Sequence, residues 1–204
     1  MTESLASSAN VLVLYYSRNG STKNLAYKIA QGIEKTGAQA TIRTVPPVSD
    51  NLSTTQSSVP ETGDPYVTKH NLMTCSGLAL GSPTRFGNMA SAMKYFWDST
   101  SDTWLSGHLE GKPACVFTST GSMHGGQEST LLTMMIPLLH HGMILCGLPY
   151  SEPALHTTQS GGSPYGVSHV SGNKEDATLT AEETALAIAQ GERLAALSIK
   201  LNDK

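Results

Sequence analysis

Charged residues are scarce in this sequence, and neither sign dominates. The 204 residues hold 13 Lys and Arg against 16 Asp and Glu, which gives a formal net charge of −3. No run of basic residues occurs, and a nucleic-acid binder needs a basic surface to displace counterions from phosphates. Nucleic acid is therefore not an expected partner. A chain of this length fits one domain of ordinary size.

Cysteine is also scarce, and long hydrophobic runs are missing. Cys75, Cys115 and Cys146 cannot all pair, and no C-x-x-C spacing occurs. Free cysteine is among the most buried residue types, so we expect buried thiols in a reduced compartment. Residues 1–10 lack the positive charge and apolar core of a signal peptide. These features predict a cytoplasmic protein without membrane insertion.

Histidine is present, but not in a metal-binding pattern. The seven histidines show neither an H-x-x-H spacing nor the His and Cys spacing of a zinc site. We therefore expect no metal ion. His140 and His141 form an adjacent pair near the end of a predicted helix.

Short apolar runs alternate with segments of helical periodicity through most of the chain. Strands are expected at 11–15, 41–45, 77–80, 114–117 and 143–148. Apolar residues follow helical spacing at 25–33, 89–96 and 127–139. The capping box Thr180-x-x-Glu183 predicts the start of the last helix. The polar segment 46–70 is expected to be a surface connection, and 152–176 a cover over the site, a subunit contact or a disordered surface loop.

Strands that alternate with helices imply right-handed crossovers and a parallel sheet. The sequence therefore predicts an α/β fold, a doubly wound five-stranded parallel sheet with helices on both faces. We expect one domain over 1–204, with 1–10 as a flexible N-terminal extension. Ligands bind such folds at the carboxyl ends of the strands, where the winding reverses.

Three predicted loops lie at that edge. The first, between the first strand and the first helix, offers hydroxyl groups, backbone N–H groups and the positive end of a helix dipole. It has no Lys after its glycine, so it is not a Walker A loop, and a terminal monophosphate suits it better. The loops hold Ser17, Arg18, Asn19, Gly20, Ser21 and Thr22; then Pro83, Thr84, Arg85, Phe86 and Gly87; then Ser119, Thr120, Gly121, Ser122 and Gly125.

Together the loops suit a planar ring on a phosphorylated tail. The first takes a phosphate, the second adds an aromatic ring and a cation, and the third adds backbone N–H groups. Flavin mononucleotide (FMN) has this chemistry. Taken alone, the first loop could equally be a helix start capped by serine without any ligand.

Several strings resemble the WrbA family of flavodoxin-like NAD(P)H:quinone oxidoreductases, in order and over about residues 11–201. They are "VLVLYYS", "GSPTRFGNM", "FTSTGSMHGGQE", "LLHHGM", "GGSPYG" and "QGERLAALSIKL". The resemblance implies a flavodoxin-like fold, noncovalent FMN, NADH or NADPH as co-substrate and quinone as substrate. It also implies a homotetramer, a dimer of dimers. In the expected ping-pong cycle, flavin N5 accepts hydride from the nicotinamide, and a quinone then takes the nicotinamide's place.

The resemblance also assigns roles to residues of the three loops and beyond. The loop residues above would bind FMN, and His140 would lie near the flavin from a neighbouring subunit, as a cofactor-binding and catalytic residue. Trp104 would contact the substrate. His140 could instead cap its helix, and Trp104 could be ordinary packing. Asn19 departs from the family, since many relatives carry there an aromatic residue thought to help bind the nicotinamide.

The sequence also fits two other functions. The first is a flavodoxin-type electron carrier without direct NAD(P)H oxidation, although such proteins are usually strongly acidic so that charge guides docking. The second is a non-enzymatic protein that holds FMN for stability. Reduction by NAD(P)H and turnover of a quinone would separate these functions.

Overall fold

The structure, a computed structural model, describes residues 9–48, 60–172 and 177–202. The strands are β1 (Asn10–Tyr15), β2 (Gln39–Thr44), β3 (Gly77–Pro83), β4 (Pro113–Thr120), β5 (Ile144–Leu145) and β6 (Ser168–Val170). The helices are α1 (Ser21–Lys35), α2 (Lys69–Thr74), α3 (Ser91–Asp98), α4 (Ser101–Leu105), α5 (Gln127–His140), α6 (Ala154–Thr157) and α7 (Ala181–Asn202).

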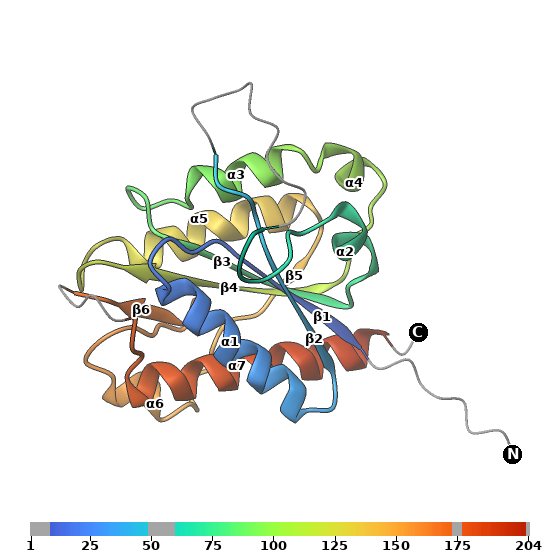
Figure 1. The fold of residues 1–204 in the computed structure, drawn as a ribbon. Coiled ribbons are helices and arrows are strands. Elements are labelled where there is room, and N and C mark those ends of the chain that lie inside the picture. The colour runs from blue at the N-terminus through green and yellow to red at the C-terminus, as the bar shows by residue number, and fades with distance from the viewer. Residues whose placement is uncertain (1–8, 49–59, 173–176, 203–204) are drawn as a thin grey trace, which may run out of the picture.

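The expected parallel sheet is confirmed. Its strand order is β2-β1-β3-β4-β5, and every pair is parallel. The chain winds from β1 to β2 on one side and then crosses to β3 on the other, so the winding reverses between β1 and β3. Helices α1 and α7 lie along one face, and α3 and α5 lie along the other (Figure 1).

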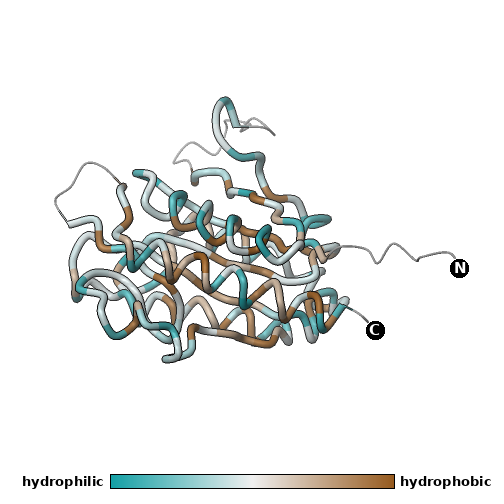
Figure 2. Tube along the Cα trace, turned by 90° about the horizontal axis from the view of Figure 1, so that it is seen from below, coloured by the Kyte–Doolittle hydropathy of each residue, from teal (hydrophilic) through white to brown (hydrophobic). Residues whose placement is uncertain are grey.

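The side chains of each strand alternate between two cores, one on each face. Val11 and Val13 pack toward α1 and α7, whereas Leu12 and Leu14 pack toward α3 and α5. All four are fully buried, as strands covered on both faces require. In Figure 2 the hydrophobic segments gather in the middle of the molecule and the hydrophilic ones in the peripheral loops.

Helices α1 and α7 cross at two glycines. A Cβ on Gly32 would lie 2.1 Å from the carbonyl oxygen of Ile188, and one on Gly191 would lie 2.1 Å from that of Ile29. The backbones of the two helices therefore touch where they cross. The capping box that begins α7 is confirmed: Thr180 N donates to Glu183, and Glu183 N donates to Thr180 Oγ1.

The sheet differs from the prediction at its far edge, where the expected strand 143–148 is only two residues long. After β5 the chain leaves the sheet, forms α6, and returns as β6, which pairs with the carboxyl half of β4. Strands β5 and β6 thus share one edge of β4. Gly166 allows this return, because a Cβ there would lie 2.2 Å from the carbonyl oxygen of Val116.

Other expectations on the connections also need correction. The polar stretch 152–176 contains α6 and β6, although its residues 173–176 lie outside the described residues. The expected connection 46–70 ends within α2, and its residues 49–59 are likewise outside. Asn10, expected in a flexible extension, begins β1, and Ala9 is buried.

Candidate functional site

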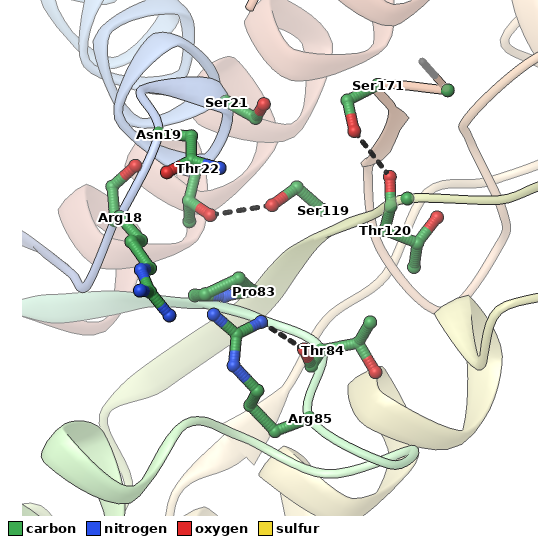
Figure 3. A pocket seen from close by; sticks show the side chains of 13 residues that line it. Arg18, Asn19, Ser21, Thr22, Pro83, Thr84, Arg85, Ser119, Thr120 and Ser171 are labelled. Carbon is green, nitrogen blue, oxygen red and sulfur yellow. Dashed lines mark hydrogen bonds between the residues drawn. The ribbon is translucent and has the colours of Figure 1, made fainter. Parts of the chain in front are cut away.

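A cavity of about 570 Å³ opens at the carboxyl ends of β1, β3 and β4, where the winding reverses. It lies at the edge that the sequence predicts for a ligand, and the side chains that line it are shown in Figure 3. The lining residues are Ser17, Arg18, Asn19, Ser21, Thr22, Pro83, Thr84, Arg85, Ser119, Thr120, Gly121, Ser171 and Gly172.

The first loop presents the N-terminus of α1 to this cavity. Gly20 precedes the helix with a φ of 94°, and no side chain caps the helix. The first helical hydrogen bond runs from Asn24 N to Gly20 O at 2.9 Å. Within the described part of the chain, the backbone N–H groups of Ser21, Thr22 and Lys23 therefore have no acceptor. Free donors at the positive end of a helix dipole form an anion site.

A buried hydrogen bond joins the first loop to β4. Thr22 Oγ1 and Ser119 Oγ lie 2.8 Å apart, and both side chains are buried (Figure 3). On the other side of β4, Ser171 donates its backbone N–H and its hydroxyl to Thr120 O, at 2.9 and 3.1 Å. The sequence prediction missed Ser171 and Gly172, because only the pairing of β6 with β4 brings them to the cavity.

The second loop is a tight turn held at both ends. Arg85 N donates to Asn88 O at 2.7 Å, and Asn88 N donates back to Arg85 O at 3.1 Å. Thr84 N donates to Ser119 O at 2.9 Å, and its hydroxyl accepts from Thr130 Oγ1 at 2.8 Å. Thr84 and Arg85 are thereby fixed at the cavity wall. The N-cap of α3 is Ala90, two residues after Asn88.

Phe86 does not line the cavity, although it was expected to contact the ligand. Its side chain is fully exposed, and its φ of 53° is the one positive φ of a non-glycine residue within the described ranges. Gly87 also lies outside the cavity, where it packs against Gly126 of the third loop. A Cβ on Gly126 would be 3.1 Å from the Cα of Gly87. Phe86 is therefore an exposed aromatic residue in a strained backbone conformation, directly after Arg85 of the cavity lining.

The third loop brings backbone donors to the opposite wall. Gly121 lines the cavity, and the N–H groups of Gly121 and Ser122 have no acceptor among the described residues. Ser122 and Gly125 do not line the cavity themselves, because Gly125 N turns back to donate to Ser122 O at 3.1 Å. The loop is held from behind by Gln127, whose side chain donates to Met123 O at 2.8 Å.

His140 and Trp104 lie in a different cavity of the same chain. This second cavity, of about 590 Å³, is bounded by α3, α4 and α5. The two residues contact each other there, since Trp104 Nε1 donates to His140 O at 2.7 Å. Within one chain, His140 therefore does not reach the first cavity. Its placement near the flavin of a neighbouring subunit stays a prediction.

His141, beside His140, is buried and serves the structure. Its Nε2 lies 3.1 Å from Thr100 Oγ1, and its ring meets Trp97 edge-on with centroids 5.2 Å apart. Burial, and then the neighbouring His140, lower the pKa of His141, which favours the neutral ring. His141 thus fixes the corner between α3 and α4 that carries Trp104.

Charge at the first cavity is positive. Arg18 and Arg85 are the charged side chains among its lining residues, and both extend toward the side of the cavity near Pro83 (Figure 3). Among the described residues, no Asp or Glu lines it. Within the described ranges, no group of three His, Cys, Asp or Glu side chains is placed to hold a metal ion.

Comparison with known proteins identifies the family. A family profile described as NADPH-dependent FMN reductase matches residues 9–151. A protein of Rhizobium rhizogenes named NAD(P)H dehydrogenase (quinone) is 39% identical over 196 residues, covering 95% of this chain and 98% of the relative. A protein of the same name from Chromohalobacter salexigens is 40% identical over 202 residues, covering 95% and 98%. This chain belongs to the WrbA-type NAD(P)H:quinone oxidoreductase family.

Solved structures agree with the flavodoxin-like fold of this family. A WrbA-like flavodoxin of Agrobacterium tumefaciens superimposes with a TM-score of 0.67 at 23% identity, covering 95% of this chain and 99% of its own. An archaeal flavodoxin superimposes with a TM-score of 0.61 at 18% identity, covering 94% and 99%. At these identities the likeness establishes the fold alone.

The residues of the first cavity fit the family's cofactor, FMN. Free N–H groups and hydroxyls at the N-terminus of α1 suit a monophosphate, and they replace the lysine of a nucleoside triphosphate site. The volume of about 570 Å³ lies within the usual range of small-molecule sites.

Proposed function

We propose that this protein reduces quinones by two electrons in a ping-pong cycle, with NADH or NADPH as the donor and FMN as the bound cofactor. Its family supports the coarser statement that it is an NAD(P)H-dependent flavoprotein oxidoreductase. The observation that carries the proposal is the first cavity, which joins the free donors of α1 to the backbone donors of the third loop. When bound, FMN accepts a hydride from the nicotinamide at N5 and passes two electrons to the quinone.

The first loop would bind the phosphate of the cofactor. The N–H groups of Ser21, Thr22 and Lys23 point along the axis of α1 and need an acceptor. The hydroxyl of Ser17 donates no hydrogen bond within the described part of the chain, although it accepts one from Gly20 N at 3.1 Å. A phosphate bound here would accept several charge-assisted hydrogen bonds from these groups, and no paired counter-ion would have to be desolvated.

The second and third loops would hold the ring together. Thr84 and Arg85 of the second loop line the cavity beside Thr120 and Gly121. The free N–H group of Gly121 would stabilise negative charge on the ring's pyrimidine edge, as an oxyanion hole does. No side-chain nucleophile is required for this reaction.

We further propose that the active enzyme is a homotetramer, in which His140 and Trp104 of one subunit face the cofactor of its neighbour. The support is a group of exposed apolar residues beside the second cavity. Trp104 is 49% exposed, Ile136 53% and Leu139 57%, and Phe86 is fully exposed. Burial of such residues against a second copy would remove them from water and cover Phe86.

We also propose that the enzyme is cytoplasmic and that the chain forms one cofactor-binding domain. Cys75, Cys115 and Cys146 are free and buried, as is usual in a reducing compartment. No helix within the described residues is long and apolar enough to cross a membrane.

An anaerobic reaction tests the proposal against a flavodoxin-type electron carrier. FMN-loaded protein is mixed with NADH or NADPH while the visible absorbance of the flavin is followed. Fast bleaching in one two-electron step, reversed by benzoquinone, supports the proposed function. If neither nucleotide bleaches the flavin, the proposed function is wrong and the electron carrier becomes the better description.

A further inference from the structure

A third cavity lies directly beside the first and has no role in the proposed function so far. Its volume is about 560 Å³, and Ser17 and Arg18 line both cavities. Its remaining walls are the carboxyl ends of β1 and β2, the start of α1, and the segment 60–66. A ligand that extends from the first cavity past Arg18 therefore enters this space.

Segment 60–66 is held in place by backbone and side-chain hydrogen bonds. Thr44 N donates to Pro65 O at 3.1 Å, and Val67 N donates to Thr44 O at 2.8 Å, so the segment continues the sheet beside β2. The hydroxyls of Tyr15 and Tyr27 donate to the same oxygen of Asp64, Oδ2, at 2.7 and 3.1 Å. Within the described part of the chain, Oδ1 of Asp64 accepts no hydrogen bond. One carboxylate oxygen is thus fixed by two tyrosine hydroxyls, and the other has no partner among the described residues.

The lining of this third cavity combines three kinds of group. Tyr16 and Tyr66 supply aromatic rings, Arg18 and Lys23 supply positive charge, and Asp64 supplies the negative charge. Aromatic rings stack on bases, and guanidinium groups bind phosphates. A carboxylate that accepts from a ribose hydroxyl is the usual mark of an unphosphorylated adenine ribose. Together these groups match a nucleoside joined to a diphosphate.

We propose that the third cavity binds the adenosine half of the pyridine dinucleotide, and that Asp64 selects NADH over NADPH by accepting a hydrogen bond from the ribose 2′-hydroxyl. This inference rests on the proposed function, because it concerns how NADH, the electron donor of that reaction, is bound. Arg18 lies in both cavities, where it meets the diphosphate that joins the two halves of the dinucleotide. A 2′-phosphate would bring like charge against Asp64, which disfavours NADPH.

Binding is measured first on wild-type, FMN-loaded protein by titration calorimetry with ADP-ribose and 2′-phospho-ADP-ribose. We expect ADP-ribose to bind and its 2′-phosphate to bind more weakly by about tenfold or more, because of the like charges. ADP-ribose should also compete with NADH in steady-state turnover. These measurements need no variant and do not depend on turnover alone.

Asp64→Asn then removes the charge and keeps an oxygen for the hydroxyls of Tyr15 and Tyr27. We expect the preference for NADH over NADPH in kcat/KM to fall by about tenfold, the value of one charged hydrogen bond, with unchanged affinity for FMN. Glu34→Gln is the matched control, since it makes the same change of charge on an exposed residue of α1 and should leave the preference unchanged.

The outcomes separate this inference from the proposed function. If NADH bleaches the flavin but ADP-ribose does not bind, or its 2′-phosphate binds equally well, the third cavity is not the adenosine site. An unchanged preference in folded Asp64→Asn protein likewise removes the role of Asp64. If neither nucleotide bleaches the flavin, the proposed function fails and this inference fails with it.

Discussion

Glu183 connects three parts of the structure, and its charge is expected to stabilise all of them. The carboxylate is fully buried and accepts hydrogen bonds from Thr180 N, Ser160 Oγ, Gly161 N, Val170 N and His169 Nδ1. These donors lie at the start of α7, in the turn before β6, and in or at the end of β6. Removing the negative charge therefore weakens the attachment of β6 to α7, and with it the position of Ser171 at the cavity.

The magnitude follows from the pKa of this carboxyl. Burial alone would raise the pKa of Glu183, but the hydrogen bonds from His169, Thr180, Ser160 and Gly161 outweigh burial and lower it from 4.5 to about 2. At 1.36 kcal/mol per pKa unit, the ionised form contributes about 3 kcal/mol to stability at neutral pH. A hydrogen bond to a charged group contributes about 1.5–3 kcal/mol in other proteins, which is the same order of magnitude.

Glu183→Gln is the variant that tests this magnitude, and Glu182→Gln on the same helix is its control. Urea unfolding at neutral pH, followed by circular dichroism, should show a loss of about 3 kcal/mol for Glu183→Gln. Little change is expected for the control. The affinity for FMN should fall in Glu183→Gln, because Ser171 and Gly172 follow β6.

The pH dependence of the stability difference between wild type and Glu183→Gln provides a second test. A lowered pKa stabilises the folded state above pH 4.5, and this stabilisation is lost as the pH falls from 4.5 through about 2. The difference between wild type and Glu183→Gln should therefore be full at neutral pH and shrink across that window. A Glu183→Gln protein as stable as wild type at neutral pH, or a difference that grows on acidification, would refute this account of Glu183.

Three further predictions concern the helix crossing and the two cavities. Gly191→Ala should destabilise the fold by about 1–3 kcal/mol or more, measured by urea unfolding, because the new methyl group meets the backbone of α1. Thr22→Val removes the buried hydrogen bond to Ser119 and should weaken FMN binding by about tenfold, measured by quenching of flavin fluorescence; equal affinity would contradict the role of this contact. Trp104→Phe loses the hydrogen bond to His140 and should lower quinone turnover while FMN affinity stays unchanged. If sedimentation shows an active monomer, the proposed role of His140 from a neighbouring subunit is wrong.

The local sequence determined strands β1 to β4, helices α1, α3, α5 and α7, and the three loops at the edge of the sheet. Alternating burial of Val11 to Leu14 and the capping box at Thr180 depend on residues close together in the chain. The glycine that opens the N-terminus of α1 is likewise local. For this reason, the open helix N-terminus at the edge of the sheet could be predicted from a few residues after the first strand.

Several residues reach the cavities only through tertiary contacts. Strand β6 is too short to stand out in sequence, and it forms because the carboxyl half of β4 offers an unpaired edge. Asp64 enters the third cavity only because segment 60–66 lies beside β2, and the side chains of Tyr15 and Tyr27 then bind its carboxylate. Trp104 and His140 meet through the corner of α3, α4 and α5. Such contacts join residues far apart in the chain, so local periodicity carries no signal for them, and packing against the finished sheet selects them.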